Sequence, residues 1–364
     1  MTDDEFIPEW ATHPGDVLST LLRKRDIRQN ELAERTGMSA KHVNQIIKRS
    51  VGVSAEVAVL LGRALDTSPR FWTTLDADFQ ASAKERASRE ELATYIPWVR
   101  QFDASVLKRH RIIKNSDDPI DKVEKVLTFF GVSNPDAFEK SRMEPQASFR
   151  RSQSFRVETP NTALWLRLVE IKAANVPTQS FSPSKARRAA KKLPSMTMLD
   201  LVDGFLAARA ELAEAGVALS FVPQVPGTRV NAVTLWNGDK PMIGLTERNR
   251  AKDIFWFNLA HEIGHVVLHP KRHTFLDLEE DKAKPSRAER EADEFAQTTL
   301  LPEDANATIR AATSRADLAL IASRFGVSMY VIAGRYGHLT KNWRLVGKDR
   351  VSISDEELVE LEGV

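Results

Sequence analysis

Three histidines stand at four-residue intervals in the stretch FWFNLAHEIGHVVLH, residues 255–269. Side chains four residues apart share one face of an α-helix, so His261 and His265 can direct their imidazoles at one ion. Glu262 lies beside this pair and completes an H-E-x-x-H pattern, in which the acid is the general base of a zinc hydrolase. The flanking residues are apolar, so the helix is expected to be buried, where two histidines need polar partners. The alternative is a pair of core histidines bonded to other protein groups.

A catalytic zinc site takes three protein ligands and leaves a further position for water, so a third ligand is required. The stretch SRAEREADEFAQTTLLP at 286–302 is typical of a second amphipathic helix. Within it, Glu289 and Asp293 lie one turn apart on one face. We expect Glu289 to bind the ion. We expect Asp293 to accept a hydrogen bond from a ligating imidazole, at the ring nitrogen that does not bind the ion. Glu291 is the alternative ligand, and an exposed helix surface is the alternative position for each acid.

A hydrolytic site also needs a donor that stabilises negative charge on the reacting oxygen. His269, His273 and Tyr336 are the candidates, and the sequence does not decide among them. His269 follows His265 by one further turn, which favours a place behind the ligands or at the rim of the site. A packed or solvent-facing side chain is the alternative.

The expected strand at 241–245 is a candidate for binding the substrate, because an edge strand can pair with an extended peptide. An ordinary sheet strand is the simpler prediction.

Another informative spacing lies near the N-terminus, in RQNELAERTGMSAKHVNQIIK at 28–48. Its order of helix, glycine-containing turn and helix is that of a helix-turn-helix, whose second helix enters the major groove of DNA by its N-terminal end. A bundle that binds protein instead of DNA is the alternative, since this part of the chain is only weakly basic. The residues expected at base edges are Ala40, Lys41, Asn44 and Gln45, and those expected at phosphates are Gln29, Ser39 and Lys48.

Periodicity and turn residues predict an α+β chain that is mostly helical. Short β-type runs at 217–222, 230–235 and 241–245, the last two joined by Asn237-Gly238, predict a small β-sheet against the H-E-x-x-H helix. A polar loop is expected between that helix and the next one. The expected divisions are a tail at 1–12, a five-helix helix-turn-helix domain at 13–80, a helical connector at 81–97, a mainly helical region at 98–215, a zincin-like catalytic core at 216–313, and C-terminal helices and tail at 314–364.

Composition excludes several classes of protein. The 364 residues contain no cysteine, so neither a disulfide framework nor a thiolate zinc site is present. The N-terminal residues MTDDEFIPEW lack the basic and apolar regions of a signal peptide. No apolar run approaches the ~18 residues that a membrane-spanning helix needs. We therefore expect a cytoplasmic protein that does not bind a membrane.

Several of these segments resemble the ImmA/IrrE family of bacterial metallopeptidases. They are HEIGHVVLH, the E-x-x-A-D-x-F-A pattern that starts at Glu289, and LLP at 300–302. The segments ALWLR at 163–167 and GVALSFVP at 216–223 extend the likeness, which covers roughly Trp98 to His338. The resemblance implies a fold in which a small sheet lies across the active-site helix. It also implies endopeptidase activity on transcriptional repressors.

The same resemblance implies a set of site residues. Zn2+ would be held by His261, His265 and Glu289, and Glu262 would be the catalytic residue. The sequence does not depart from the family pattern at these four positions.

The residues at 13–80 resemble an Xre/Cro-type helix-turn-helix domain, and HPGDVLSTLL and SPRFWTTLDADF within them resemble HigA-type antitoxins. This likeness implies a double-stranded DNA operator as partner and a homodimer, because such domains commonly bind two half-sites. Two functions follow. The first is an antitoxin-like transcriptional regulator with a zinc endopeptidase that cleaves a protein such as a repressor. The second is a HigA-type antitoxin that binds a cognate toxin, with a metallopeptidase-like domain that senses or binds without turnover. The intact Glu262 favours the first, and the antitoxin-like N-terminal residues favour the second.

Overall fold

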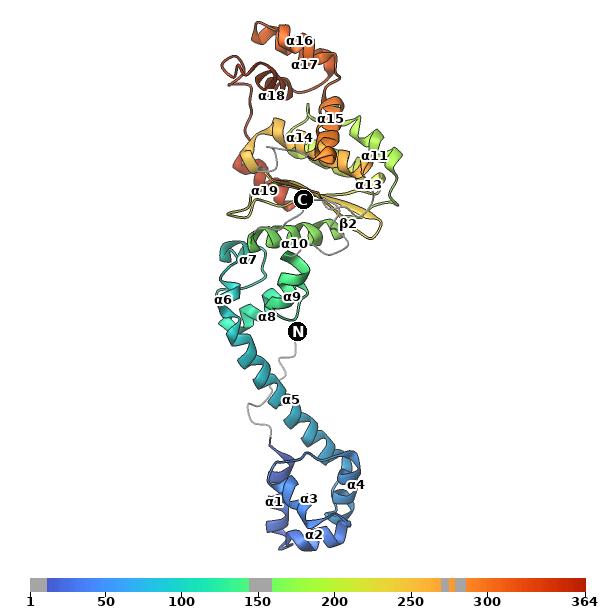
Figure 1. Ribbon diagram of the computed structural model, residues 1–364, viewed down its shortest axis with the longest axis vertical. Coiled ribbons are helices and arrows are strands. Elements are labelled where there is room, and N and C mark those ends of the chain that lie inside the picture. The colour runs from blue at the N-terminus through green and yellow to red at the C-terminus, as the bar shows by residue number, and fades with distance from the viewer. Residues whose placement is uncertain (1–11, 144–158, 270–274, 279–285) are drawn as a thin grey trace. The chain divides into compact units, whose positions relative to one another are not determined.

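The computed structural model describes residues 12–143, 159–269, 275–278 and 286–364. The chain divides into two compact units, one formed by residues 1–96 with 118–124 and the other by residues 97–117 with 125–364. The described residues are mostly helical, and one small sheet lies in the second unit (Figure 1). This confirms the predicted α+β fold. Of the expected features, His273 and nearly all of the tail at 1–12 lie outside the described residues.

The first unit begins with five helices, and polar side chains cap the N-termini of the first, third and fourth. His13 Nδ1 accepts a hydrogen bond from Gly15 N at 2.9 Å, and the hydroxyls of Ser39 and Ser54 cap the third and fourth helices. Gly37 ends the second helix with a φ of 73°, a conformation that glycine adopts without strain. The helices are α1 (Pro14–Lys24), α2 (Gln29–Thr36), α3 (Ala40–Ile47), α4 (Ala55–Ala64) and α5 (Pro69–Thr94).

These five helices enclose one apolar core. Leu18, Leu32, Ile46 and Trp72 belong to it and have no exposed surface. Helix α5 continues without a break into the connector expected at 81–97. The fifth helix of the bundle and most of the connector are therefore a single element.

The second unit contains a four-stranded sheet in the order β1-β3-β2-β4. β1 pairs with β3 in parallel, whereas β2 pairs with β3 and with β4 in the antiparallel sense. The strand expected at 241–245 therefore lies inside the sheet, which confirms the simpler prediction of an ordinary sheet strand and contradicts the alternative of an edge strand that pairs with a substrate peptide. The polar loop expected after the H-E-x-x-H helix also contains a strand that was not predicted. The strands are β1 (Ala218–Phe221), β2 (Val230–Asn237), β3 (Lys240–Leu245) and β4 (Phe275–Leu278).

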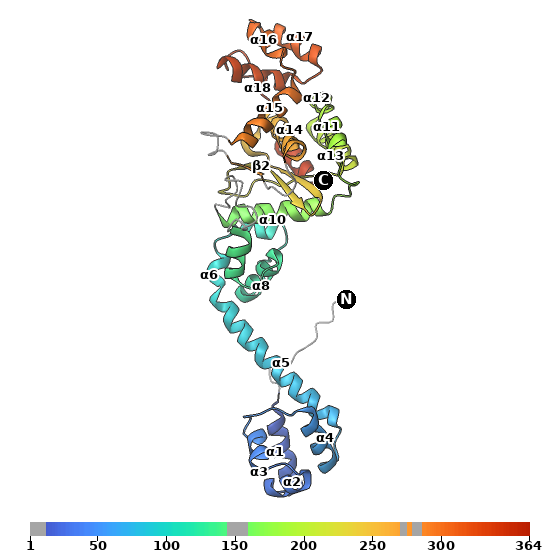
Figure 2. The same cartoon turned by 45° about the vertical axis from the view of Figure 1, so that its right-hand side comes forward.

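Helices cover both faces of this sheet. α10 (Pro160–Ala174) contacts β1 and β3, and α14 (Lys252–Leu268) contacts β2 and β3. Figures 1 and 2 show these two helices on opposite faces. Strands covered on both faces read as continuous apolar runs, and β1 and most of β2 and β3 are buried accordingly. Twelve of the 17 residues of α14 are buried, so the H-E-x-x-H helix runs through the centre of this unit.

Short helices precede the sheet, and a second group follows it. No single helix among the described residues is long and apolar enough to span a membrane. The helices α17 (Arg315–Phe325) and α18 (Met329–Thr340) have the length and composition only when taken together, and they are bent by 119° relative to each other.

The tail expected at the C-terminus includes a helix capped by Ser354. The remaining elements are α6 (Ile96–Val99), α7 (Ala104–Arg109), α8 (Pro119–Phe130), α9 (Pro135–Phe138), η1 (Glu139–Met143), α11 (Pro183–Ala190), α12 (Leu193–Met196), α13 (Leu201–Glu214), η3 (Arg248–Arg250), α15 (Arg287–Leu300), α16 (Ala305–Ala311), α17 (Arg315–Phe325), α18 (Met329–Thr340) and α19 (Asp355–Gly363).

Candidate metal centre and nucleic-acid interface

The candidate metal centre lies where α14 and α15 pack against each other. Gly264 allows their close approach, because a Cβ atom at this position would lie 3.1 Å from Ala292 Cα. Ser286 begins α15 by accepting a hydrogen bond from Glu289 N at 3.2 Å. The first turn of α15 therefore carries the Glu289 side chain, and the packing of the two helices places it beside α14.

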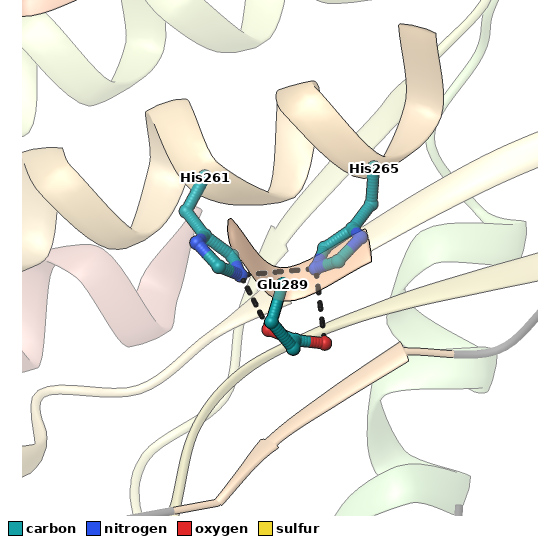
Figure 3. A group of neighbouring side chains, drawn as sticks. All are labelled: His261, His265 and Glu289. Atoms are coloured by element: carbon teal, nitrogen blue, oxygen red, sulfur yellow. Dashed lines mark hydrogen bonds and ion pairs between the residues drawn. The ribbon is translucent and has the colours of Figure 1, made fainter. Parts of the chain in front are cut away.

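His261, His265 and Glu289 direct their side chains toward one point (Figure 3). The two histidine Nε2 atoms are 2.9 Å apart, and the Glu289 carboxylate lies 3.1 Å from His261 Nε2 and 3.5 Å from His265 Nε2. Ligand atoms bound about 2.0–2.2 Å from a tetrahedral zinc ion lie roughly 3.3–3.5 Å from one another. The separations of the two imidazole nitrogens and the carboxylate oxygen lie at or a few tenths of an ångström below this range, so small shifts of the side chains would let all three bind one zinc ion.

The protonation states of this group also suit a metal. Burial lowers the pKa of His261, but hydrogen bonds to Asp293 and Glu289 outweigh burial and raise it to about 10. Burial lowers the pKa of His265 to about 4, against the opposing effect of Glu289. Burial raises the pKa of Glu289, but the opposing effect of the two imidazoles is larger and brings this pKa well below its usual range. At neutral pH, Glu289 and His265 therefore have the states that bind metal, while His261 holds a proton that an ion must displace.

Two further acids of α15 have different positions. The carboxylate of Asp293 accepts a hydrogen bond from His261 Nδ1 at 2.9 Å, which leaves Nε2 facing the Glu289 carboxylate. Glu291, the alternative ligand, instead bonds to Arg287 at 2.6 Å near the surface. The structure thus brings Glu289, and not Glu291, to the two histidines.

The three candidates for an oxyanion donor have different positions. His269 follows the last residue of α14, and its Nε2 lies 3.0 Å from the carbonyl oxygen of Ala288. This bond occupies the nitrogen and connects the end of α14 with the first turn of α15, next to Glu289. Tyr336 is buried in the apolar core of the second unit. His273 lies outside the described residues.

Glu262 is completely buried next to the candidate ligands. The hydroxyl of Thr234, on β2, donates a hydrogen bond to Glu262 Oε2 at 2.5 Å. The same hydroxyl lies 3.2 Å from the backbone oxygen of Glu262. This contact was not predicted, because Thr234 precedes Glu262 by 28 residues and only the packing of the sheet against α14 joins them. A threonine within an apolar β-run was the one available signal.

The helix-turn-helix residues lie on α2, on α3 and in the turn between them. Val43 and Ile46 face the core of the first unit with no exposed surface, so the other side of α3 faces outward. The predicted contact residues all retain exposed surface: Gln29, Ser39, Ala40, Lys41 and Lys48 are exposed, and Asn44 and Gln45 are half-buried.

The region of the candidate metal centre and the region of the helix-turn-helix each match a known protein family. Residues 219–336 match the family model of the IrrE N-terminal-like domain, a peptidase family, and residues 18–72 match a helix-turn-helix family. The chain carries a helix-turn-helix domain and an IrrE N-terminal-like domain. Both resemblances expected from the sequence are thereby confirmed. The IrrE N-terminal-like domain includes α14 and α15 and therefore all three candidate ligands.

Solved structures similar to this chain match about a quarter of it. The antitoxin HigA of Pseudomonas aeruginosa, solved with the higBA promoter, is 34% identical, with a TM-score of 0.22, over 22% of this chain and 90% of that chain. A Pseudomonas aeruginosa protein in complex with its operator DNA (18 bp) is 32% identical, with a TM-score of 0.23, over 24% and 93%. A HigA-family addiction module antidote protein from Coxiella burnetii is 22% identical, with a TM-score of 0.22, over 23% and 92%. No curated protein matches the chain.

Proposed function

We propose that this chain is a DNA-binding transcriptional regulator that carries a zinc-dependent endopeptidase. One observation carries the peptidase part: His261, His265 and Glu289 converge from two helices, with Glu262 adjacent to them. The match to the IrrE N-terminal-like domain supports it, and the match to the helix-turn-helix family supports the DNA-binding part.

The roles of the individual side chains follow from their contacts. A zinc ion held by His261, His265 and Glu289 would supply Lewis-acid chemistry, acidifying water and polarising the carbonyl of a peptide bond. Glu262 acts as general base, taking a proton from the attacking water and returning it to the leaving amine. Asp293 accepts a hydrogen bond from Nδ1 of the His261 ring and so keeps Nε2 directed at the ligand point.

DNA binding is assigned to the exposed side of α3. Its first turn presents Ala40 and Lys41, and Asn44 and Gln45 follow one turn later. Amide side chains can bind adenine through two hydrogen bonds, and lysine can bind guanine or a phosphate. Gln29, Ser39 and Lys48 are assigned to the phosphates of a double-stranded operator, and two copies of the chain would bind two half-sites.

We propose a protein substrate, such as a transcriptional repressor encoded beside this chain. The test begins with elemental analysis of the purified protein and continues with its incubation with the product of the neighbouring gene. The parent should contain one zinc per chain and cleave that protein. Glu262→Gln should retain the zinc and DNA binding and lose cleavage. Equal cleavage by variant and parent, or a parent without zinc, would contradict the proposal.

The second candidate function is a HigA-type antitoxin whose metallopeptidase-like domain senses or binds a partner without turnover. One observation favours it: Glu262 has no exposed surface, whereas a general base must reach both water and a substrate. A cognate toxin encoded next to this chain would then be neutralised equally by the parent and by Glu262→Gln, with no cleaved product. Cleavage that depends on Glu262 would decide against this function.

A further inference from the structure

Thr234 is a buried polar residue near the middle of β2, and its side chain contacts α14 at Glu262. We infer that Thr234 is a positioning residue, whose hydroxyl holds the Glu262 carboxylate in the place from which it acts as general base. This inference rests on the proposed endopeptidase function and adds to it a residue that no sequence motif marks.

One hydroxyl of the sheet contacts both parts of the same residue on α14. It lies 2.5 Å from Oε2 of Glu262 and 3.2 Å from the backbone oxygen of Glu262. Both Thr234 and Glu262 have no exposed surface, so bulk water does not replace this bond. A hydrogen bond to a buried carboxylate is short and strong, and its loss leaves the charged group poorly compensated. The bond therefore holds Oε2 of the Glu262 carboxylate against β2.

The sheet in turn fixes the position of Thr234. Its Cα pairs with that of Ile243 on β3 and with that of Phe275 on β4, so neighbouring strands hold the backbone on both sides. A β-branched side chain also has few allowed rotamers. The hydroxyl is thus preorganised before any substrate arrives, which is the support that a catalytic carboxylate requires.

A hydroxyl suits this position for a second reason. It can donate a hydrogen bond to a carboxylate and accept one from a carboxylic acid. Thr234 can therefore remain bonded to Oε2 while Glu262 takes up a proton and returns it. A valine has the same shape and makes neither bond.

The test uses the full-length, zinc-loaded protein and acetohydroxamate as a probe. Acetohydroxamate chelates zinc through two oxygens and offers a proton to a carboxylate beside the ion, so its affinity reports where the Glu262 carboxylate lies. Thr234→Val removes the hydroxyl and keeps the branched shape, and Thr234→Ser restores the hydroxyl. Thr246→Val is the matched control, because the Thr246 hydroxyl is also buried but lies 3.1 Å and 3.2 Å from backbone oxygens of β2.

We expect Thr234→Val to keep one zinc per chain and to bind acetohydroxamate about tenfold more weakly in calorimetric titration. Thr234→Ser and Thr246→Val should stay within about twofold of the parent. In a Glu262→Gln background, Thr234→Val should have no further effect, because the carboxylate that Thr234 holds is gone. Should Thr234→Val fail to fold, Thr234→Ala removes the same hydroxyl with less crowding and carries the same expectation.

Three results would overturn the inference. Equal affinity of Thr234→Val and the parent for acetohydroxamate refutes the positioning role and leaves the proposed function standing. Loss of zinc from Thr234→Val also refutes it, because Thr234 would then support the metal ligands rather than Glu262. A parent that contains no zinc, or whose zinc does not bind the probe, has no open metal position beside Glu262, and the inference then falls together with the proposed function.

Discussion

Asp293 on α15 accepts a hydrogen bond from the His261 ring on α14, with 2.9 Å between Oδ1 and Nδ1. A residue of one helix thereby sets the ring orientation of a candidate metal ligand on the other. An imidazole that donates from Nδ1 to a carboxylate is also a better electron donor at Nε2. The bond therefore bears on metal affinity as well as on packing.

Asp293→Asn should weaken zinc binding by about 10–100-fold, because an amide oxygen is a poorer acceptor than a carboxylate for the His261 ring. Competition with a chromogenic chelator measures the affinity. Glu291→Gln is the control, since Glu291 bonds to Arg287 near the surface and should leave zinc affinity unchanged. Equal affinities of Asp293→Asn and the parent would contradict the assigned role.

Zinc binding at pH 8 should release about one proton per site. The pKa of His261 is about 10, so its ring is protonated at that pH, whereas His265, with a pKa of about 4, and Glu289, with a lowered pKa, are not. Calorimetric titration in buffers of different ionisation enthalpy measures the release as a slope. A binding heat that does not depend on the buffer would show that this assignment of protons is wrong.

The stability of the zinc-free protein should fall on both sides of about pH 6.5. The pKa of His261 is raised from 6.5 to about 10, so its contribution is complete below pH 6.5 and is lost as the pH rises through 10. The pKa of His265 is lowered from 6.5 to about 4, so its contribution is complete above pH 6.5 and is lost as the pH falls through 4. Urea unfolding across this range measures both losses. A His261→Gln variant that retains the full alkaline loss would contradict the first assignment.

Gly264→Val should lower the free energy of unfolding by about 1–3 kcal/mol, because the added side chain collides with the backbone of Ala292. It should also reduce the increase in melting temperature that zinc produces, since α15 and Glu289 are displaced from the histidines. Gly264→Ala should show smaller effects of the same sign, because its Cβ meets Ala292 Cα at 3.1 Å. Thermal unfolding with and without zinc distinguishes these outcomes, and a Gly264→Val variant with the zinc response of the parent would refute the packing argument.

Lys41→Ala combined with Gln45→Ala should weaken operator binding by about 1–3 kcal/mol for each base that the variant no longer binds, without changing zinc content. Gel shifts at physiological salt with the DNA upstream of this gene measure the effect. The matched control is Gln80→Ala with Lys84→Ala, which removes the same side-chain types from exposed positions of α5. A parent protein without any sequence-dependent shift would contradict the DNA-binding role.

Local spacing is what made the convergence of His261, His265 and Glu289 predictable. The two histidines need only helical geometry to share a face, and Glu289 with Asp293 repeats that relation on the next helix. Strand positions and the Asn237-Gly238 turn follow from equally local patterns, and the structure places β2 and β3 where they were expected.

The order of the strands and the contacts between the sheet and α14 could not be predicted from the sequence. The residues at 241–245 are recognisable as a strand, but their place between β1 and β2 depends on a parallel pairing with a segment more than twenty positions earlier in the chain. The bond between Thr234 and Glu262 depends on that order and on the face that α14 covers. His269 was left open for the same reason, because its partner, the carbonyl of Ala288, belongs to a backbone segment that has no side-chain signature.

The candidate ligands are divided between helices, with 28 residues from His261 to Glu289. A nascent chain in which α15 has not docked offers an ion only two imidazoles, which is too few for a lasting complex. Under the proposed function, zinc would therefore bind late in maturation, after tertiary assembly of the second unit. Because the helix-turn-helix bundle has its own core, the proposed DNA binding would begin in immature molecules, before the proposed hydrolysis.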